Sequence, residues 1–283
     1  MSSTACILTD SSAQFSQPAF AGRELIWTVP FHVTAPPEKY SGEVKVSDLP
    51  NRLSKSGSLQ LQPPSQDILY DSLFSLTSKY DDVFVILSSS GLSSAFSNAQ
   101  EASSVLQGRA DIHLFDSQTI SSGLGGLVQF AAALLNSGRA SSDVEKLLRQ
   151  QIPRVYSLLC PSTLSYLHRS CFVDEAQSAV NDLLGISPIF TLDEGRIAPL
   201  EKSKSSHHLM EFFLEFIGEF EHITSISLIH PTPQQGSEMR EVRVFVEETY
   251  PSTQLCEHPI NLPVAAMFGP KTAGLFLQER AIN

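Results

Sequence analysis

Three segments of the chain place serine, aspartate and glycine directly after a short apolar run, a combination that suits the binding of an anion. The clearest is the sequence SSSGLSSA at residues 88–95, which follows the apolar run at residues 83–87. Similar polar segments follow the runs at residues 5–9 and 112–115. Hydroxyl groups and unpaired amides at a strand–helix turn can hold a carboxylate or phosphate, because a helix N-terminus is electropositive. The same residue types also cap helices without binding anything.

The apolar runs that precede these turns are rich in β-branched and aromatic residues and are bounded by helix breakers, which predicts buried strands. Helical patterns follow at residues 67–79, 127–135 and 142–151, with Ser65 as the expected N-cap of the first and a loop at residues 54–66 before it. Strands that alternate with helices indicate a parallel sheet, whose ligands lie beyond the carboxyl ends of the strands. We therefore expect an α/β domain with the three turns gathered at one edge.

The pattern changes in the second half of the chain. Residues 189–200 read as a β-hairpin around Asp193, Glu194 and Gly195, residues 208–220 as an amphipathic helix, and residues 223–229 and 275–277 as strands. Hairpins mixed with helices indicate an α+β domain. We therefore predict two domains, residues 1–155 and 156–283, and a ligand cleft between them.

The composition narrows the classes of function. The chain has 283 residues, 42% of them hydrophobic, and a net charge of −11, which disfavours nucleic acid and anionic membrane surfaces as partners. No segment approaches the ~20 apolar residues of a membrane span, and a strand is expected by residue 5, so we expect no signal peptide and a cytoplasmic protein. The four cysteines show no metal-binding or disulfide spacing, so we expect no metal.

Two other functions fit parts of this pattern. A hydrolase could use Ser90 or Ser93 as nucleophile with His230 as base, but the chain has no GxSxG sequence at the turn. A phosphate or nucleotide site could use the serine turns, but neither GxxxxGK[ST] nor GxGxxG is present. No lysine or arginine lies in the three turns, so helix dipoles alone would neutralise a phosphate.

Taken in order, the motifs resemble the DegV family of bacterial fatty-acid-binding proteins over essentially the whole chain. The sequence ILTDSS at residues 7–12 is similar to the family's opening TDS turn, and SSGLS at residues 89–93 is similar to its SSGLSGT turn. Pro64 and Ser65 match the end of its TSQPS loop. The later matches are FDS at residues 115–117 with GLG at 123–125, ISPI at 186–189 with DEGRI at 193–197, and GP at 269–270 with Gly274.

This resemblance implies a function. Such a protein binds one long-chain fatty acid in a tunnel between its two domains and presents the carboxyl group to a separate kinase, as a step of phospholipid metabolism. It implies a lipid carrier that is not itself an enzyme, with a fatty acid as ligand and no cofactor. A family member that has lost its ligand and keeps a structural or interaction role is the remaining alternative.

The resemblance also indicates which residues bind the ligand. In the family, hydroxyls of the TSQPS loop and of the LSGT turn hold the carboxylate, with a polar residue before the final GP. Here Ser93 matches the turn, whereas Leu61, Gln62 and Met267 occupy the other positions. We expect Asp10 to order the first turn. The expected binding residues are Ser93, with the amides near Gly91 and Ser94 as further donors, Gln62, Ser65 and Thr9 nearby, and Leu61 and Met267 at the mouth.

Overall fold

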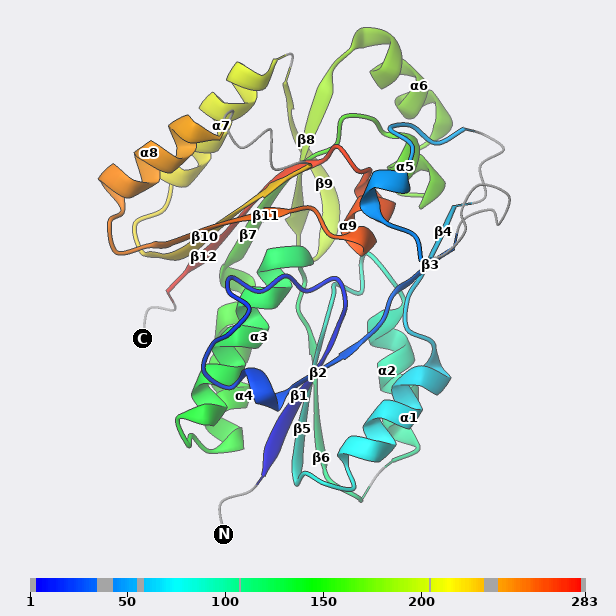
Figure 1. Ribbon diagram of the computed structural model, residues 1–283, viewed down its shortest axis with the longest axis vertical. Helices are drawn as coiled ribbons and strands as arrows, with labels where there is room; N and C mark the ends of the chain where they lie inside the picture. The colour runs from blue at the N-terminus through cyan, green and yellow to red at the C-terminus, as the bar shows by residue number, and fades with distance from the viewer. Residues whose placement is uncertain are drawn as a thin grey trace.

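Two β-sheets dominate the computed structural model, one in each half of the elongated molecule (Figure 1). The structure describes residues 4–34, 43–54, 59–106, 108–203, 205–231 and 239–280. The first sheet has the strand order β2-β1-β5-β6, and all of its pairings are parallel. Its strands are β1 (Ala5–Asp10), β2 (Ile26–Val29), β5 (Asp82–Leu87) and β6 (Asp111–Asp116).

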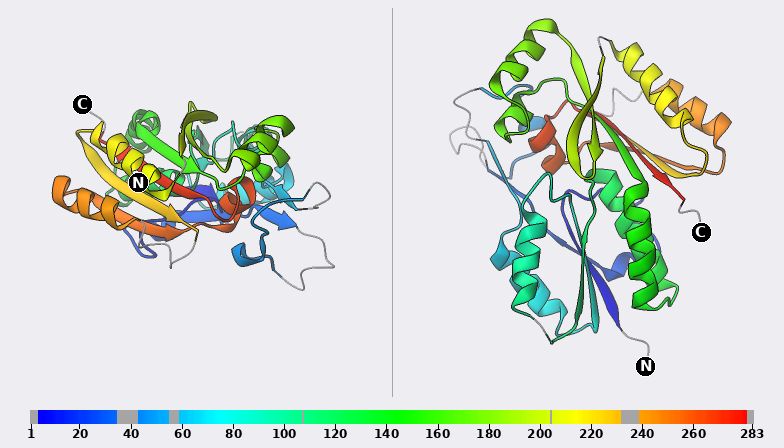
Figure 2. Two further views of the ribbon diagram at one scale, coloured as in Figure 1. Left: turned by 90° about the horizontal axis from the view of Figure 1, so that it is seen from above. Right: turned by 180° about the vertical axis from the view of Figure 1, so that it is seen from behind.

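Helices cover both faces of this parallel sheet, which explains why its central strand is apolar along its whole length. In β5, Val83 and Val85 pack against one pair of helices, whereas Phe84 and Ile86 pack against the other pair. The two pairs lie on opposite sides of the sheet in Figures 1 and 2. They are α1 (Gln66–Leu76) with α2 (Ala95–Ser104), and α3 (Ser121–Asn136) with α4 (Ser141–Gln151).

The second sheet is mixed, with the order β11-β10-β12-β7-β8-β9. Only β10 and β11 pair in parallel. One face of β10 and β12 is covered by α7 (Ser206–Gly218) and α8 (Arg240–Thr249), and the other face is turned toward the first sheet (Figure 1). The strands are β7 (Val155–Cys160), β8 (Ser187–Asp193), β9 (Arg196–Ser203), β10 (Ile223–His230), β11 (Gln254–Pro259) and β12 (Ala273–Glu279).

One part of the N-terminal half crosses to the second sheet. The short antiparallel strands β3 (His32–Thr34) and β4 (Gln60–Gln62) pack against α9 (Leu262–Phe268), and Leu49 and Leu59 join a buried cluster with residues of the C-terminal half. The remaining helices, α5 (Ser165–Arg169) and α6 (Glu175–Leu184), follow β7. Short 3-10 helices lie at Arg23–Leu25, Val46–Asp48 and Ile152–Arg154.

The fold agrees with the expected α/β domain followed by an α+β domain. The second sheet begins with β7 at Val155, and the domain boundary after residue 155 stays a prediction. Two expected elements were wrong in extent. Part of the loop predicted at residues 54–66 is β4, whose partner β3 is distant in sequence, and residues 55–58 of that loop lie outside the described part.

The helix expected from residue 127 begins at Ser121, because its glycines serve close packing and do not form a turn. A Cβ atom on Gly125 would lie 1.9 Å from the backbone oxygen of Gln14. The Gly-rich start of α3 is therefore the place where the helix meets the loop after β1.

Candidate functional site

The three serine-rich turns meet at the carboxyl edge of the first sheet, as expected, and Asp10 holds two of them together. Its Oδ1 accepts hydrogen bonds from the amide and hydroxyl of Ser12 at 2.9 and 2.5 Å, and its Oδ2 accepts the amide of Ser88 at 2.7 Å. The third turn joins through the amide of Ser89, which donates to the carbonyl of Thr119 at 2.8 Å. Complete burial raises the pKa of Asp10, while the hydrogen bonds from Ser12 and Ser88 act in the opposite direction. Asp10 therefore orders the turns, as predicted.

The serine turn at residues 88–95 also contacts the tip of the β8–β9 hairpin. The Ser89 hydroxyl donates to the carbonyl of Gly195 at 2.6 Å. A Cβ on Gly91 would lie 2.5 Å from that same carbonyl oxygen, so only glycine fits without a shift. Gly91 thus serves the contact between the two halves of the molecule. It also lines a surface pocket with Asp116, Asp193 and Glu194, and this pocket does not include Ser93.

A cavity of about 390 Å³, called the Ser93 cavity below, lies beside this contact. Its wall comes from the turn before α2, from β4, from the end of α5 and from α9. Five of the residues predicted from the sequence line it, namely Leu61, Gln62, Ser93, Ser94 and Met267. The other lining residues are Phe31, Leu53, Leu59, Gln60, Pro63, Leu92, Arg169, Ser170 and Ala266.

The polar groups of the Ser93 cavity suit a carboxylate. Ser93 Oγ accepts the amide of Ala95 at 3.3 Å, so its own proton remains available to a ligand oxygen. Arg169 is the only charged residue among the described lining residues, and no aspartate or glutamate lines this wall. An anion in the cavity would therefore lie near one guanidinium, with no carboxylate side chain among the described lining residues.

Three of the backbone amides that we expected to donate to the ligand are already used within the turn. The amide of Gly91 donates to Ser89 Oγ at 3.1 Å, and those of Leu92 and Ser93 donate to the Ser89 carbonyl at 3.0 and 3.2 Å. A compact turn uses these amides for its own closure. The side chains of Ser93, Ser94 and Gln62 line the cavity with polar groups, and Arg169 adds a positive charge at its edge.

Two other predicted site residues lie elsewhere. The Ser65 hydroxyl accepts the amide of Ile68 at 3.4 Å as the N-cap of α1, as its sequence position predicted. Thr9 is fully buried in β1, and its Oγ1 has no hydrogen-bond partner among the described residues. Neither residue lines the Ser93 cavity.

The sequence analysis missed Arg169 and Ser170. They end α5, far along the chain from Ser93, and only the packing of α5 beside α9 brings them to the cavity. The only available signal was an arginine followed by serine after a short helical segment. That signal is too common to select a residue.

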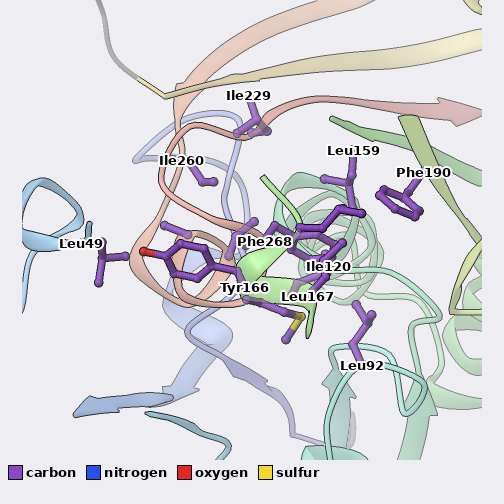
Figure 3. Packing of buried hydrophobic residues seen from close by; sticks show 14 of the residues in the cluster. Leu49, Leu92, Ile120, Leu159, Tyr166, Leu167, Phe190, Ile229, Ile260 and Phe268 are labelled. Carbon is purple, nitrogen blue, oxygen red and sulfur yellow. The ribbon is translucent and has the colours of Figure 1, made fainter. Parts of the chain in front are cut away.

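The apolar wall of the Ser93 cavity continues into a buried cluster between the two sheets. Leu59, Leu92 and Met267 belong both to the cavity wall and to this cluster. Deeper members include Tyr166 and Phe268, both fully buried, and Figure 3 shows them among side chains from both halves of the chain. The cavity thus places polar donors at the edge of an apolar interior.

The geometry gives no support to a hydrolase or a metal centre. Ser90 Oγ donates to Asp116, and among the described residues neither Ser90 nor Ser93 hydrogen-bonds to a histidine. A serine nucleophile needs such a base within hydrogen-bond reach. The described part of the chain also contains no cluster of three histidine, cysteine, aspartate or glutamate side chains that could hold a metal.

Comparison with known families agrees with the motifs. The model of the DegV family matches residues 4–280. The chain belongs to the DegV family. The DegV resemblance seen in the sequence is therefore confirmed, over nearly the whole chain.

Individual DegV relatives are similar over most of the chain. The chain is 28% identical over 220 residues to Protein DegV of Bacillus subtilis, which covers 75% of this chain and 76% of the relative. A structure described as a fatty acid binding DegV family protein from Streptococcus agalactiae superposes with a TM-score of 0.84 at 18% identity, covering 98% of this chain and 99% of the other. The Fatty Acid Kinase (Fak) B3 protein of Streptococcus pneumoniae, solved loaded with linoleic acid, gives 0.78 at 14% identity, with 98% and 100% coverage.

These DegV structures share the fold of this chain along its full length, which confirms the expected architecture. No helix among the described residues of this DegV protein is long and apolar enough to span a bilayer.

Proposed function

We propose that this DegV protein binds one long-chain fatty acid, with its carboxylate in the Ser93 cavity and its acyl chain in the buried cluster between the sheets. The observation that carries the proposal is the composition of one cavity. Ser93, Gln62 and Arg169 offer donors and a positive charge, while Leu92 and Met267 continue the same wall into the apolar interior. The description of the Streptococcus agalactiae relative as fatty acid binding supports it.

The acyl chain supplies most of the binding free energy in this proposal. Burying about 14 methylenes at ~0.8 kcal/mol each gives an upper bound near 11 kcal/mol. A hydrogen bond to a charged group contributes only about 1.5–3 kcal/mol. Because the side chains of this cluster are buried against one another, some of them must shift when the acyl chain enters. Because the unfolded chain has no such cluster, bound ligand stabilises the folded state by mass action.

The proposal is tested first by native mass spectrometry of freshly purified protein, followed by solvent extraction and lipid analysis. We expect one fatty acid per chain. Ser93→Ala should weaken palmitate binding about ten- to hundredfold, the loss of one hydrogen bond to a charged group. Ser104→Ala, on the exposed side of α2, should bind as the wild type does. A ligand-free mass without uptake of added palmitate or oleate would instead mean a family member that has lost its ligand.

We also propose that the protein presents the bound carboxyl group to a kinase and performs no chemistry itself. The Ser93 cavity is open at the surface beside the exposed residue Arg169, so a partner can reach its donors. The name of the Streptococcus pneumoniae relative, a fatty acid kinase B protein, supports this role.

In the reaction that follows, a carboxylate oxygen attacks the γ-phosphorus of ATP, and ADP leaves as the acyl-phosphate forms. The test mixes loaded protein, a bacterial fatty acid kinase and ATP, and traps the acyl-phosphate with hydroxylamine. Hydroxamate should form only when all three are present. Intact lipid binding without hydroxamate would reject the kinase partner and leave the carrier role standing.

A further inference from the structure

A second cavity, of about 550 Å³, lies between α3 and the strands β10, β11 and β12, and it shares no lining residue with the Ser93 cavity. In Figure 1 its walls lie on the side of α3 and α4, whereas β3, β4 and α5 lie on the other side of the molecule; Figure 2 shows the same separation from behind. We call it the amide-lined cavity because five glutamines line it: Gln14, Gln129, Gln151, Gln254 and Gln278.

The sheet wall of the amide-lined cavity is polar where a buried sheet face is normally apolar. Along β10, Ser225 and Ser227 line the cavity, while the alternate residues Ile226 and Leu228 pack under α7 and α8. The strand register extends the polar row, because Ser225 pairs with Gln254 on β11 and with the segment at Gln278 on β12. This face therefore consists of small hydroxyls and uncharged amides across three strands.

The helix wall approaches this polar row closely and is built from small residues. Ser122, Gly126 and Ala133 share one face of α3, with Phe130 beside them. A Cβ atom on Gly126 would lie 2.6 Å from Gln278 Nε2, so only glycine lets that amide pack directly against α3.

Two polar groups at the meeting of these walls have no partner. Ser122 is 6% exposed, and its Oγ makes no hydrogen bond among the described residues. The buried Nε2 of Gln278 is also unpartnered, although its Oε1 accepts the Ser225 hydroxyl at 3.1 Å. Because buried polar groups are nearly always hydrogen-bonded, two orphan groups lining one cavity indicate a ligand that completes them.

The charge of the amide-lined cavity restricts that ligand. Its described lining contains no carboxylate, and its one charged residue is the exposed Arg280. Burial raises the pKa of the Cys256 thiol, which stays neutral. Serine hydroxyls and glutamine amides both donate and accept hydrogen bonds, as the hydroxyls of a ligand do. Phe20 and Phe130 offer an apolar surface to its carbon skeleton.

We propose that the amide-lined cavity is a second binding site, separate from the fatty acid site, for an uncharged polyhydroxyl compound, a sugar or a polyol. In this proposal Gln278 Nε2 donates a hydrogen bond to one ligand hydroxyl, and Ser122 Oγ donates to or accepts from a second ligand hydroxyl. The apolar part of the wall contacts the ligand's C–H groups.

The test uses saturation-transfer NMR of the whole protein with D-glucose and D-sorbitol as probes, and hexan-1-ol as an apolar control. We expect saturable transfer to at least one polyol and none to hexan-1-ol. Gln278→Leu should weaken polyol binding about three- to tenfold, the effect of one lost neutral hydrogen bond. Gln100→Leu, on the exposed face of α2, should not.

The second variant, Ser122→Ala, removes only the orphan hydroxyl and guards against misfolding of Gln278→Leu. Fatty acid content and circular dichroism melting curves should match the wild type in every variant that is used. Transfer to hexan-1-ol alone would overturn the proposal in favour of a lipid cavity. Absence of transfer to both polyols would mean that the cavity holds only water. Equal polyol binding by wild type and Ser122→Ala would mean that the polyol binds elsewhere, and either result would overturn the proposal.

Discussion

The hydroxyl of Ser89 donates a hydrogen bond of 2.6 Å to the carbonyl of Gly195, and this bond fastens the second sheet to the serine turn of the first. Ser89 is completely buried, and its backbone carbonyl also closes the turn that carries Ser93. Ser89 therefore holds both the hairpin tip and the turn that places Ser93 in its cavity. A change at this contact should affect both stability and ligand binding.

Gly91→Ala tests this contact. The new Cβ would lie 2.5 Å from the Gly195 carbonyl oxygen, a backbone atom that cannot rotate away. We expect the free energy of unfolding to fall by about 1–3 kcal/mol in urea titrations. Gly218→Ala is the matched control, because nothing lies within 4 Å of its added methyl group and its helix should gain up to about 1 kcal/mol. Equal stability of the two variants would contradict the tight approach.

Asp10→Asn tests the link between the first and second serine turns. The carboxylate accepts three hydrogen bonds, from Ser12 and from the Ser88 amide, whereas an asparagine side chain turns an NH₂ group toward one of these donors. We expect a loss of about 1–3 kcal/mol in thermal or urea unfolding, the cost of a buried donor without an acceptor. Asp71→Asn, exposed on α1, should leave stability unchanged.

Glu145 predicts a specific dependence of stability on pH. Hydrogen bonds from Arg149, at 2.8 and 3.0 Å, and the contact with His113 at 2.9 Å hold the pKa of Glu145 below its ordinary value. A lowered folded-state pKa adds stability at pH values above the unfolded-state pKa, and this stability disappears as the pH falls through the folded-state value. Glu145→Gln should therefore destabilise the protein at neutral pH and match the wild type in acid.

The size of this effect is limited because Arg149 is 56% exposed and the Glu145 side chain 32% exposed. We expect less than about 1 kcal/mol at neutral pH, measured by urea titration at a series of pH values. Glu101→Gln, exposed on α2, provides the baseline. A Glu145→Gln curve that stays below the wild type at all pH values would show that packing, and not charge, was lost.

Arg169→Gln tests the electrostatic part of the proposed fatty acid site. Arg169 lines the Ser93 cavity but is exposed, so its attraction for a carboxylate is screened by salt. We expect palmitate affinity to fall a few-fold in dilute buffer, with the difference from wild type shrinking in ~1 M NaCl. Arg139→Gln, exposed after α3, should bind palmitate normally at both salt concentrations. A loss independent of salt would point to packing by the arginine stem.

Several elements followed from local patterns alone. The apolar run at residues 83–87 predicted β5, and the run is apolar throughout because helices cover both faces of this strand. Ser65 was recognised as the N-cap of α1 by its position before an apolar helical pattern. The hairpin around Gly195 was recognised from its turn residues. Such features depend on neighbouring residues, which a single sequence displays directly.

Other features could not be derived in this way. Gly91 was expected to bind the ligand, yet its position is decided by the distant Gly195. The glycines at the start of α3 were interpreted as a turn because their partners, Gln14 and Gln278, come from remote segments. Arg169 joined the candidate site without any local signal.

The sequence by itself determined several buried strands and amphipathic helices, the DegV family and the serine turn that carries Ser93, because these are recorded in the periodicity and motifs of adjacent residues. The tertiary structure decided which side chains share a cavity. It brought Arg169 and Met267 into the wall of the cavity that Ser93 lines, left Thr9 outside that cavity, and placed Gln278 and Ser122 in the wall of a second one. The physical reason is that a binding site depends on distances between remote segments, which are set by the packing of two sheets and their helices.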